Sequence, residues 1–276
     1  MGQTNVRSIG STLKYIFKNF LFIFVFALIP SYFYAASLDM ENIRALAQGL
    51  LSAENPTFAQ VFSFLSFVNS EGWILSVACF VSLGICMPLL LGFIEKHMRI
   101  GSRSFKGIWG RFNTNFLSTL FVGVLFLAMY ELWSLIASGL VYGATLLFSG
   151  IAGTVAAILL YFAMLALIAY IASVFLLWLP CLLITGYNFV DALAYSNQLY
   201  AGKKGGLFLA VFLPCVVSGV VTLLVVGVFA PMHVQLPVFF IVEILFLLLM
   251  LYYSALMFVA YFRLTGEERA DLQKKF

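Results

Sequence analysis

Long apolar segments separated by short polar connections dominate the chain. Most segments have the length of about 20 residues that a helix needs to cross the hydrocarbon core of a bilayer. They predict transmembrane helices at 19-37, 72-95, 114-138, 151-182, 206-230 and 237-262. A backbone in hydrocarbon must satisfy its own hydrogen bonds, and helices do so within one segment. The pattern therefore predicts an all-α fold, a polytopic bundle of about six transmembrane helices in a single membrane domain over 1-276.

The fourth apolar run, 151-182, is longer than one crossing requires. It either tilts or continues as an interfacial turn beyond Trp178 and Pro180. The only long polar connection, 38-71, predicts two amphipathic helices on either side of Asn55-Pro56, with apolar faces formed by Met40, Ile43, Leu46 and Leu50 and by Phe58, Val61, Phe62, Leu65 and Val68. These helices either lie on the outer interface or cap the bundle. They form a solvated loop, a lid or a docking surface for a partner.

Composition agrees with a membrane protein. The chain is 63% hydrophobic and 9% charged, with a mean hydropathy of +1.07, whereas soluble proteins have roughly 45–50% apolar and about 25% charged residues. The four cysteines lie in apolar runs and are interpreted as small hydrophobic residues. They form no CxxC pair with metal-site spacing, so we expect no metal site and no cofactor.

Basic residues are sorted to one side of the predicted membrane. Of 15 Lys and Arg residues, all but Arg44 fall before the first span, in the second-to-third or fourth-to-fifth connection, or after the sixth span. The positive-inside rule then places both termini in the cytoplasm, and we expect a bacterial cell membrane. A cleaved signal peptide over 1-36 is an alternative, but the apolar run from Phe20 exceeds the usual h-region length.

Three connections on the expected cytoplasmic side combine an amphipathic stretch with a basic turn: STLKYIFKNFLFIFVF, SFKGIWGRFNTNFLSTLF and ALAYSNQLYAGKKGGLFLAVF. Their recurrence favours three helical hairpins in series. Such stretches are typical of helices in the interface among anionic headgroups. The candidate contacts for lipid or for a protein partner are Lys96, Arg99, Arg103, Lys106, Trp109, Arg111, Lys203 and Lys204.

Charged groups inside a bilayer are costly and often functional. Glu131 and Glu243 are the acids well within predicted spans, and Tyr130 adjoins the first. If they share a cavity they suit a cation site or a proton relay. Otherwise each is neutral or bonds a neighbour. Gly139 and Gly143 form a GxxxG pattern that allows close helix packing or dimerisation.

The sequence contains no HExxH, GxSxG, Walker A or GxGxxG motif, so we expect no enzyme. Residues Pro88 to Phe208 resemble the bacterial six-helix membrane proteins related to the glycerophosphodiester phosphodiesterase membrane-anchor domain and the YciC-type inner-membrane proteins. The resemblance is carried by Pro88-Leu-Leu-Leu-Gly92, Phe105, Phe112, Trp178, Pro180, Asp191-Ala-Leu, Ser196, Leu199, Gly202-Lys203 and Leu207-Phe208. It implies a six-helix inner-membrane protein with amphipathic helices, and it brings no catalytic residue.

Two functions follow as hypotheses. The first is a non-enzymatic membrane protein with an accessory role in the envelope, which binds membrane lipids, another membrane protein or a second copy of itself, and no nucleic acid. The second is a component of a small-molecule or ion transporter that uses Glu131 and Glu243. A shared depth and cavity for these two acids would favour the second hypothesis.

Overall fold

The computed structural model describes residues 3–52, 56–68, 72–148, 150–229 and 236–273. Every regular element in these ranges is helical, which confirms the all-α prediction. The elements are α1 (Gln3–Ser37), α2 (Met40–Ser52), α3 (Phe58–Leu65), α4 (Trp73–Ile100), α5 (Ile108–Leu147), α6 (Gly150–Phe175), α7 (Trp178–Thr185), α8 (Phe189–Ala201), α9 (Lys204–Phe229), α10 (Leu236–Thr265) and the 3₁₀ turn η2 (Ala270–Leu272). Asn55, at the predicted break between the two amphipathic helices, lies outside the described residues.

Six of the described helices are long and apolar enough to cross a membrane, and they correspond to the six predicted spans. The helices start earlier or end later than the apolar runs. Of the three amphipathic stretches, STLKYIFKNFLFIFVF belongs to α1, and SFKGIWGRFNTNFLSTLF forms the first part of α5 from Ile108 onward. Only the stretch that begins ALAYSNQLYA lies in a separate helix, α8. The long fourth run is interrupted after Phe175, and α7 follows. Pro180 fits in the first turn of α7, where a backbone N–H has no intrahelical partner to lose.

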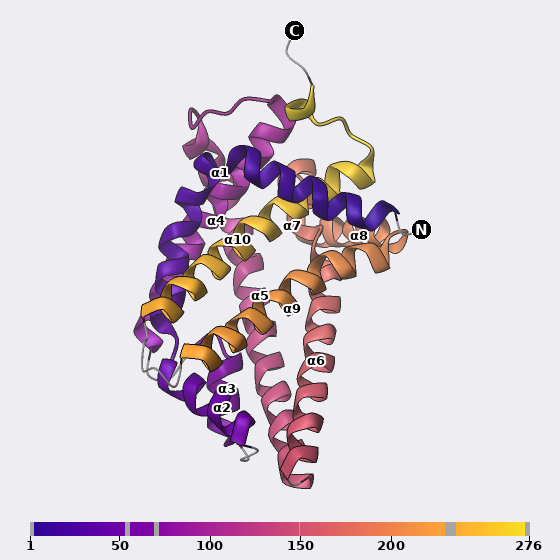
Figure 1. Cartoon of the computed structure of the whole chain (residues 1–276). Coiled ribbons are helices and arrows are strands. Elements are labelled where there is room, and N and C mark those ends of the chain that lie inside the picture. Colours follow the sequence, from indigo (N-terminus) through magenta and orange to yellow (C-terminus); the bar gives the residue numbers. More distant parts are fainter. Residues whose placement is uncertain (1–2, 53–55, 69–71, 149, 230–235, 274–276) are drawn as a thin grey trace.

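The contacts between the six long helices follow one another in a closed ring, and Figure 1 shows these helices along their length. Helix α1 packs against α4 and α10, α4 against α5, α5 against α6, α6 against α9, and α9 against α10. The three expected hairpin pairs, α1 with α4, α5 with α6 and α9 with α10, are therefore neighbours in space. Aliphatic and aromatic side chains cover the outside of the ring, among them Leu21 and Leu159, as expected for a surface that faces lipid tails.

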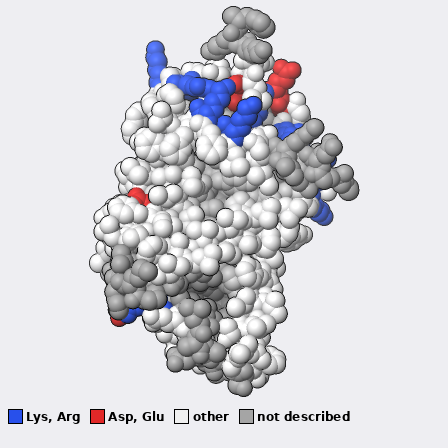
Figure 2. All heavy atoms as spheres, in the orientation of Figure 1, with Lys and Arg blue, Asp and Glu red and all other residues white. Residues whose placement is uncertain are grey.

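One end of the ring carries most of the polar structure. We call it the terminal end, because α1 starts and α10 ends there and Arg263 Nη1 donates to Ser8 Oγ at 2.6 Å. Most charged side chains visible in Figure 2 gather at this end, so the structure brings together the basic connections that the positive-inside rule assigns to one side. Below them lies the main core, a cluster that includes Leu90, Ile94, Leu177, Leu256 and Phe258.

Candidate functional site

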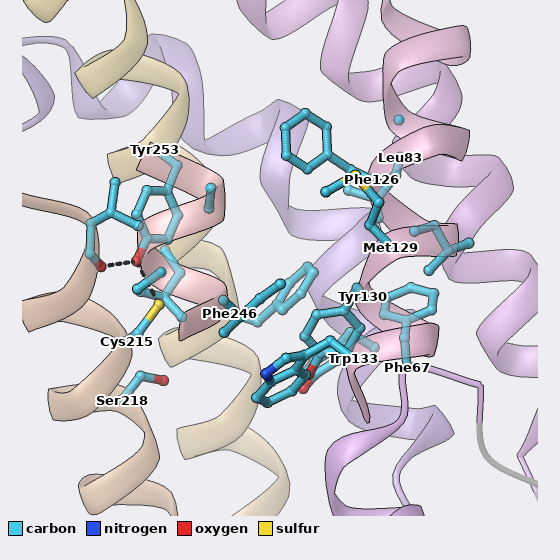
Figure 3. Close-up of a pocket in the computed structure, with 18 of the residues that line it drawn as sticks. Phe67, Leu83, Phe126, Met129, Tyr130, Trp133, Cys215, Ser218, Phe246 and Tyr253 are labelled. Carbon is cyan, nitrogen blue, oxygen red and sulfur yellow. Dashed lines mark hydrogen bonds between the residues drawn. The ribbon is translucent and has the colours of Figure 1, made fainter. Parts of the chain in front are cut away.

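The ring surrounds a partly open cavity of about 650 Å³ between the main core and the end opposite the termini (Figure 3). Its walls come from α1, α4, α5, α6, α9 and α10, and most lining side chains are apolar, such as Phe126, Met129 and Phe246. None of the described lining residues carries a formal charge. The volume lies within the range of roughly 300–1,000 Å³ that is typical of small-molecule sites.

Helices α2 and α3 close the end of this cavity. Helix α2 packs against α9 and α3 packs against α5, so the pair crosses the ring. Ile43 packs with Val238 and Val242 on one side. On the other side, α2 and α3 join a cluster with α5 and α6 that comprises Leu46, Val61, Leu65, Trp133, Ala137, Val141, Ala157 and Met164. Of the arrangements that the sequence left open, α2 and α3 cap the bundle; we call them the lid.

Local sequence explains why the lid helix α3 forms. Thr57 is its N-cap, and the Thr57 hydroxyl accepts from the Gln60 N–H at 3.3 Å while the Gln60 side chain accepts from the Thr57 N–H at 2.8 Å. This reciprocal pair is a capping box, which satisfies two N–H groups at the start of a helix. The apolar residues of α3 then recur at helical spacing and point toward the ring.

Glu131 binds the chain just after α3. One carboxyl oxygen accepts from the Phe67 N–H at 2.8 Å and from the Val68 N–H at 3.2 Å, and the other accepts from the Ser66 hydroxyl at 2.8 Å. The side chain therefore holds the lid to α5. Glu131 does not line the cavity, although its neighbour Tyr130 does.

Glu243, the second predicted acid, lies on α10 and is half-buried. It has no hydrogen bond or ion pair within the described part of the chain, and it does not line the cavity, although Val242 and Phe246 on the same helix do. The two acids thus have different surroundings. The structure does not assemble them with Tyr130 into one polar site in the cavity.

The polar groups that do face the cavity are mainly hydroxyls, contributed by Tyr34, Thr119, Tyr130, Tyr161, Ser218 and Thr222. None of these hydroxyls has a hydrogen-bond partner in the described ranges. Two other aromatic residues that line the cavity do have hydrogen-bond partners for their polar groups. Trp133 Nε1 donates to the Met164 carbonyl at 2.8 Å, and the Tyr253 hydroxyl donates to the Val211 carbonyl at 2.8 Å. Figure 3 shows Ser218 and Cys215 on the α9 side and Tyr130 and Trp133 opposite them.

At the terminal end, several of the predicted contacts for lipid or a partner also bond within the protein. The Lys96 amine donates to the carbonyls of Ser104 and Lys106 at 3.0 and 2.6 Å, which fixes the connection between α4 and α5. Arg99 and Arg111 both pair with Glu95, at 2.9 and 2.6 Å.

Glu95 was not singled out in the sequence. Its side chain is 4% exposed, and it joins the end of α4 to the start of α5 through Arg111. The spacing of four residues between Glu95 and Arg99 is a signal that could have revealed part of this cluster.

His97, two residues beyond the predicted span 72-95, lies in the last turn of α4 and is buried, because α4 extends to Ile100. Its Nδ1 lies 3.1 Å from the Tyr15 hydroxyl, and Arg103 Nε donates to its Nε2 at 3.3 Å. Arg269 covers the Tyr15 ring, with 5.6 Å between the guanidinium carbon and the ring centroid.

The remaining predicted contacts, Lys106, Trp109, Lys203 and Lys204, are exposed and available to headgroups or a partner. For Gly139 and Gly143, an added Cβ would meet nothing within 4 Å. No neighbouring helix of the described chain therefore packs closely on this GxxxG pattern.

Comparisons with protein-family models, curated proteins and solved structures found no match to this chain. The fold itself defines the class: a multi-pass α-helical membrane protein with six helices able to span the bilayer, within the residues that the structure describes. The family resemblance therefore remains a prediction. What the chain does must be argued from the cavity and its lid.

Proposed function

We propose that this membrane protein binds a membrane lipid and holds the apolar part of the lipid inside the helix ring. The observation that carries the proposal is the cavity of about 650 Å³, whose described lining residues are mostly apolar and carry no charge. An empty apolar space loses the dispersion contacts of its lining atoms, and water needs polar partners that most of these walls do not offer. A hydrocarbon chain restores the contacts without requiring hydrogen bonds.

This role needs no chemical step, in keeping with our proposal that the protein is not an enzyme. Exposed Lys203 and Lys204 offer contacts to anionic headgroups at the terminal end. The open Gly139 and Gly143 face offers close approach to another membrane helix, of a partner or of a second copy. An accessory role in the envelope of a bacterial cell, with both termini cytoplasmic, fits the resemblance and the basic connections and stays part of the proposal.

The transport hypothesis has less support. It relied on Glu131 and Glu243 in one cavity, but neither residue is among those that line the cavity, and Glu131 already accepts hydrogen bonds from the lid. A proton relay through these acids remains a prediction that proteoliposome flux assays can test.

A substitution on α5 tests lipid binding directly. Gly123 lines the cavity, and a Cβ added there would meet nothing within 4 Å, so Gly123→Leu puts four carbons into the open space without an initial clash. Gly139→Leu is the matched control, because Gly139 lies on the same helix, is equally open and does not line the cavity. The readout is the lipid that remains bound to the purified full-length protein, measured by native mass spectrometry and lipid extraction.

We expect Gly123→Leu to lose the bound lipid several-fold while Gly139→Leu retains it. Equal retention by wild type and both variants, with unchanged thermal unfolding, would show that the cavity is not the lipid site and would overturn the proposal.

A further inference from the structure

Three tyrosine side chains line the half of the cavity nearest the lid. Tyr34 comes from the end of α1, Tyr130 from the middle of α5 and Tyr161 from α6. Phe64 of α3 packs on the Tyr161 ring with 6.3 Å between centroids, and Tyr130 packs against the same cluster. Tyr161 reaches toward α9, where its hydroxyl oxygen lies 3.1 Å from the place that a Cβ on Gly219 would occupy. Three walls of the ring thus contribute one polar group each to the same region.

The aromatic rings that carry these hydroxyls are held by packing. The Tyr34 ring stacks on Phe246, with 4.1 Å between ring centroids, and on Phe67, which follows α3 of the lid, with 6.0 Å between centroids. Tyr130 packs on Trp133 at 5.4 Å, and Trp133 is itself fixed by its hydrogen bond to the Met164 carbonyl. Fixed rings present their hydroxyls at set positions, which lowers the entropy cost of binding a ligand.

These hydroxyls have unused hydrogen-bonding capacity, since no partner for them exists within the described residues. A phenol both donates and accepts, so it can bind a hydroxyl or a carbonyl of a ligand. Leaving such groups unpaired in an apolar site is unfavourable. The arrangement therefore points to a ligand with a neutral polar end.

The surroundings disfavour a charged end. No Lys or Arg is among the described residues that line the cavity, so none of them can neutralise a phosphate, and an unpaired charge in an apolar interior is very costly. The Glu131 carboxyl adjoins Tyr130 in the chain and lies at the lid, where it would repel an anion. The lid helix α2 carries one basic residue, Arg44, and most of the basic side chains that could bind a phosphate gather at the terminal end, beyond the main core.

We infer that the lipid of this cavity is an uncharged one, of the diacylglycerol class, whose hydroxyl and ester carbonyls bind Tyr34, Tyr130 and Tyr161 beneath the lid. Its acyl chains extend toward Met87, Leu179 and Met257 at the deep end. The inference rests on the proposed function and adds the chemical class of the ligand.

Two lipids with the same chains separate the alternatives. Dioleoylglycerol and dioleoyl phosphatidate differ by one phosphate group, and radiolabelled forms of each can be titrated onto the full-length protein in detergent. We expect dioleoylglycerol to bind at least about tenfold more tightly, since a buried hydrogen-bonding site strongly rejects a ligand that it cannot pair.

Removing two hydroxyls tests the named residues. Tyr130→Phe combined with Tyr161→Phe keeps the rings and should weaken dioleoylglycerol binding by roughly tenfold to thirtyfold, from the loss of two hydrogen bonds. The control is Tyr170→Phe, an exposed tyrosine of α6 that does not line the cavity, and it should bind as wild type does.

The outcomes distinguish this inference from the proposed function. Equal affinity for the two lipids in the wild type, or no effect of the paired Tyr→Phe change, overturns the uncharged-lipid assignment. If Gly123→Leu still abolishes binding in those cases, the cavity remains a lipid site. If neither lipid binds and Gly123→Leu leaves the co-purified lipid unchanged, both proposals fail.

Discussion

The attachment of the lid by Glu131 leads to a quantitative prediction. Three hydrogen bonds join the Glu131 carboxyl to Ser66, Phe67 and Val68, with lengths of 2.8, 2.8 and 3.2 Å. At about 1 kcal/mol of net free energy for each bond, Glu131→Ala removes roughly 3 kcal/mol from the closed lid. A difference of that size raises the open population about 150-fold. Glu131→Gln, which keeps one acceptor oxygen, should have a smaller effect in the same direction.

Hydrogen exchange of the full-length protein in detergent or nanodiscs measures this opening segment by segment. In Glu131→Ala, the amides of α3 and of residues 66–68 should exchange faster, while those in the middle of α10 should keep the wild-type rate. Glu243→Ala is the control, because Glu243 has no hydrogen-bond or ion-pair partner in the described part of the chain.

Wild-type exchange in α3 after Glu131→Ala would refute the assignment of Glu131 as the residue that holds the lid. Faster exchange throughout the bundle would also refute it, because that result would indicate global destabilisation. A lid released in Glu131→Ala should in addition speed dissociation of the lipid, and the same samples can report this rate.

Two further predictions concern the terminal end. Glu95→Gln breaks the ion pairs of a buried carboxylate with Arg99 and Arg111. We therefore expect the free energy of unfolding to fall by about 2 kcal/mol and the Tm to fall by roughly 4–8 °C in thermal unfolding. Arg99→Gln, at the exposed side of the cluster, should lower the free energy of unfolding by less than about 1 kcal/mol, and equal effects of the two changes would contradict this assignment. Lys203→Gln with Lys204→Gln should reduce the anionic lipid that native mass spectrometry detects on the protein, by about fivefold for each exposed charge; unchanged retention would leave these lysines as topology signals only.

The resemblance of the chain to inner-membrane anchor domains and the position of both termini in the cytoplasm remain predictions. A reporter fused to either end would test the orientation. The structure adds a constraint, because α1 starts and α10 ends at the same end of the ring, where Arg263 reaches Ser8. The start of α1 and the end of α10 must therefore lie on the same side of any membrane that the six helices cross.

Apolar segments and amphipathic faces could be predicted from the sequence alone. The six spans and the helices of the lid follow from local composition, since the free energy of placing a segment in lipid is close to a sum over its own residues. Ile43, Leu46, Val61 and Leu65 were assigned to apolar faces for the same reason, and all four are buried. The acids Glu131 and Glu243 could also be identified from the sequence, because a charged residue is rare within an apolar run.

What these residues contact was decided only by the tertiary structure. Glu131 and Ser66 are 65 positions apart in the chain, and the cavity is shaped by side chains from all six long helices. Lys96 and Arg111, predicted as contacts for lipid or a partner, also bond within the chain because the fold brings acceptors to them. Insertion into lipid depends on each segment separately, whereas cavities, lids and ion pairs depend on the relative positions of helices, which no single segment encodes.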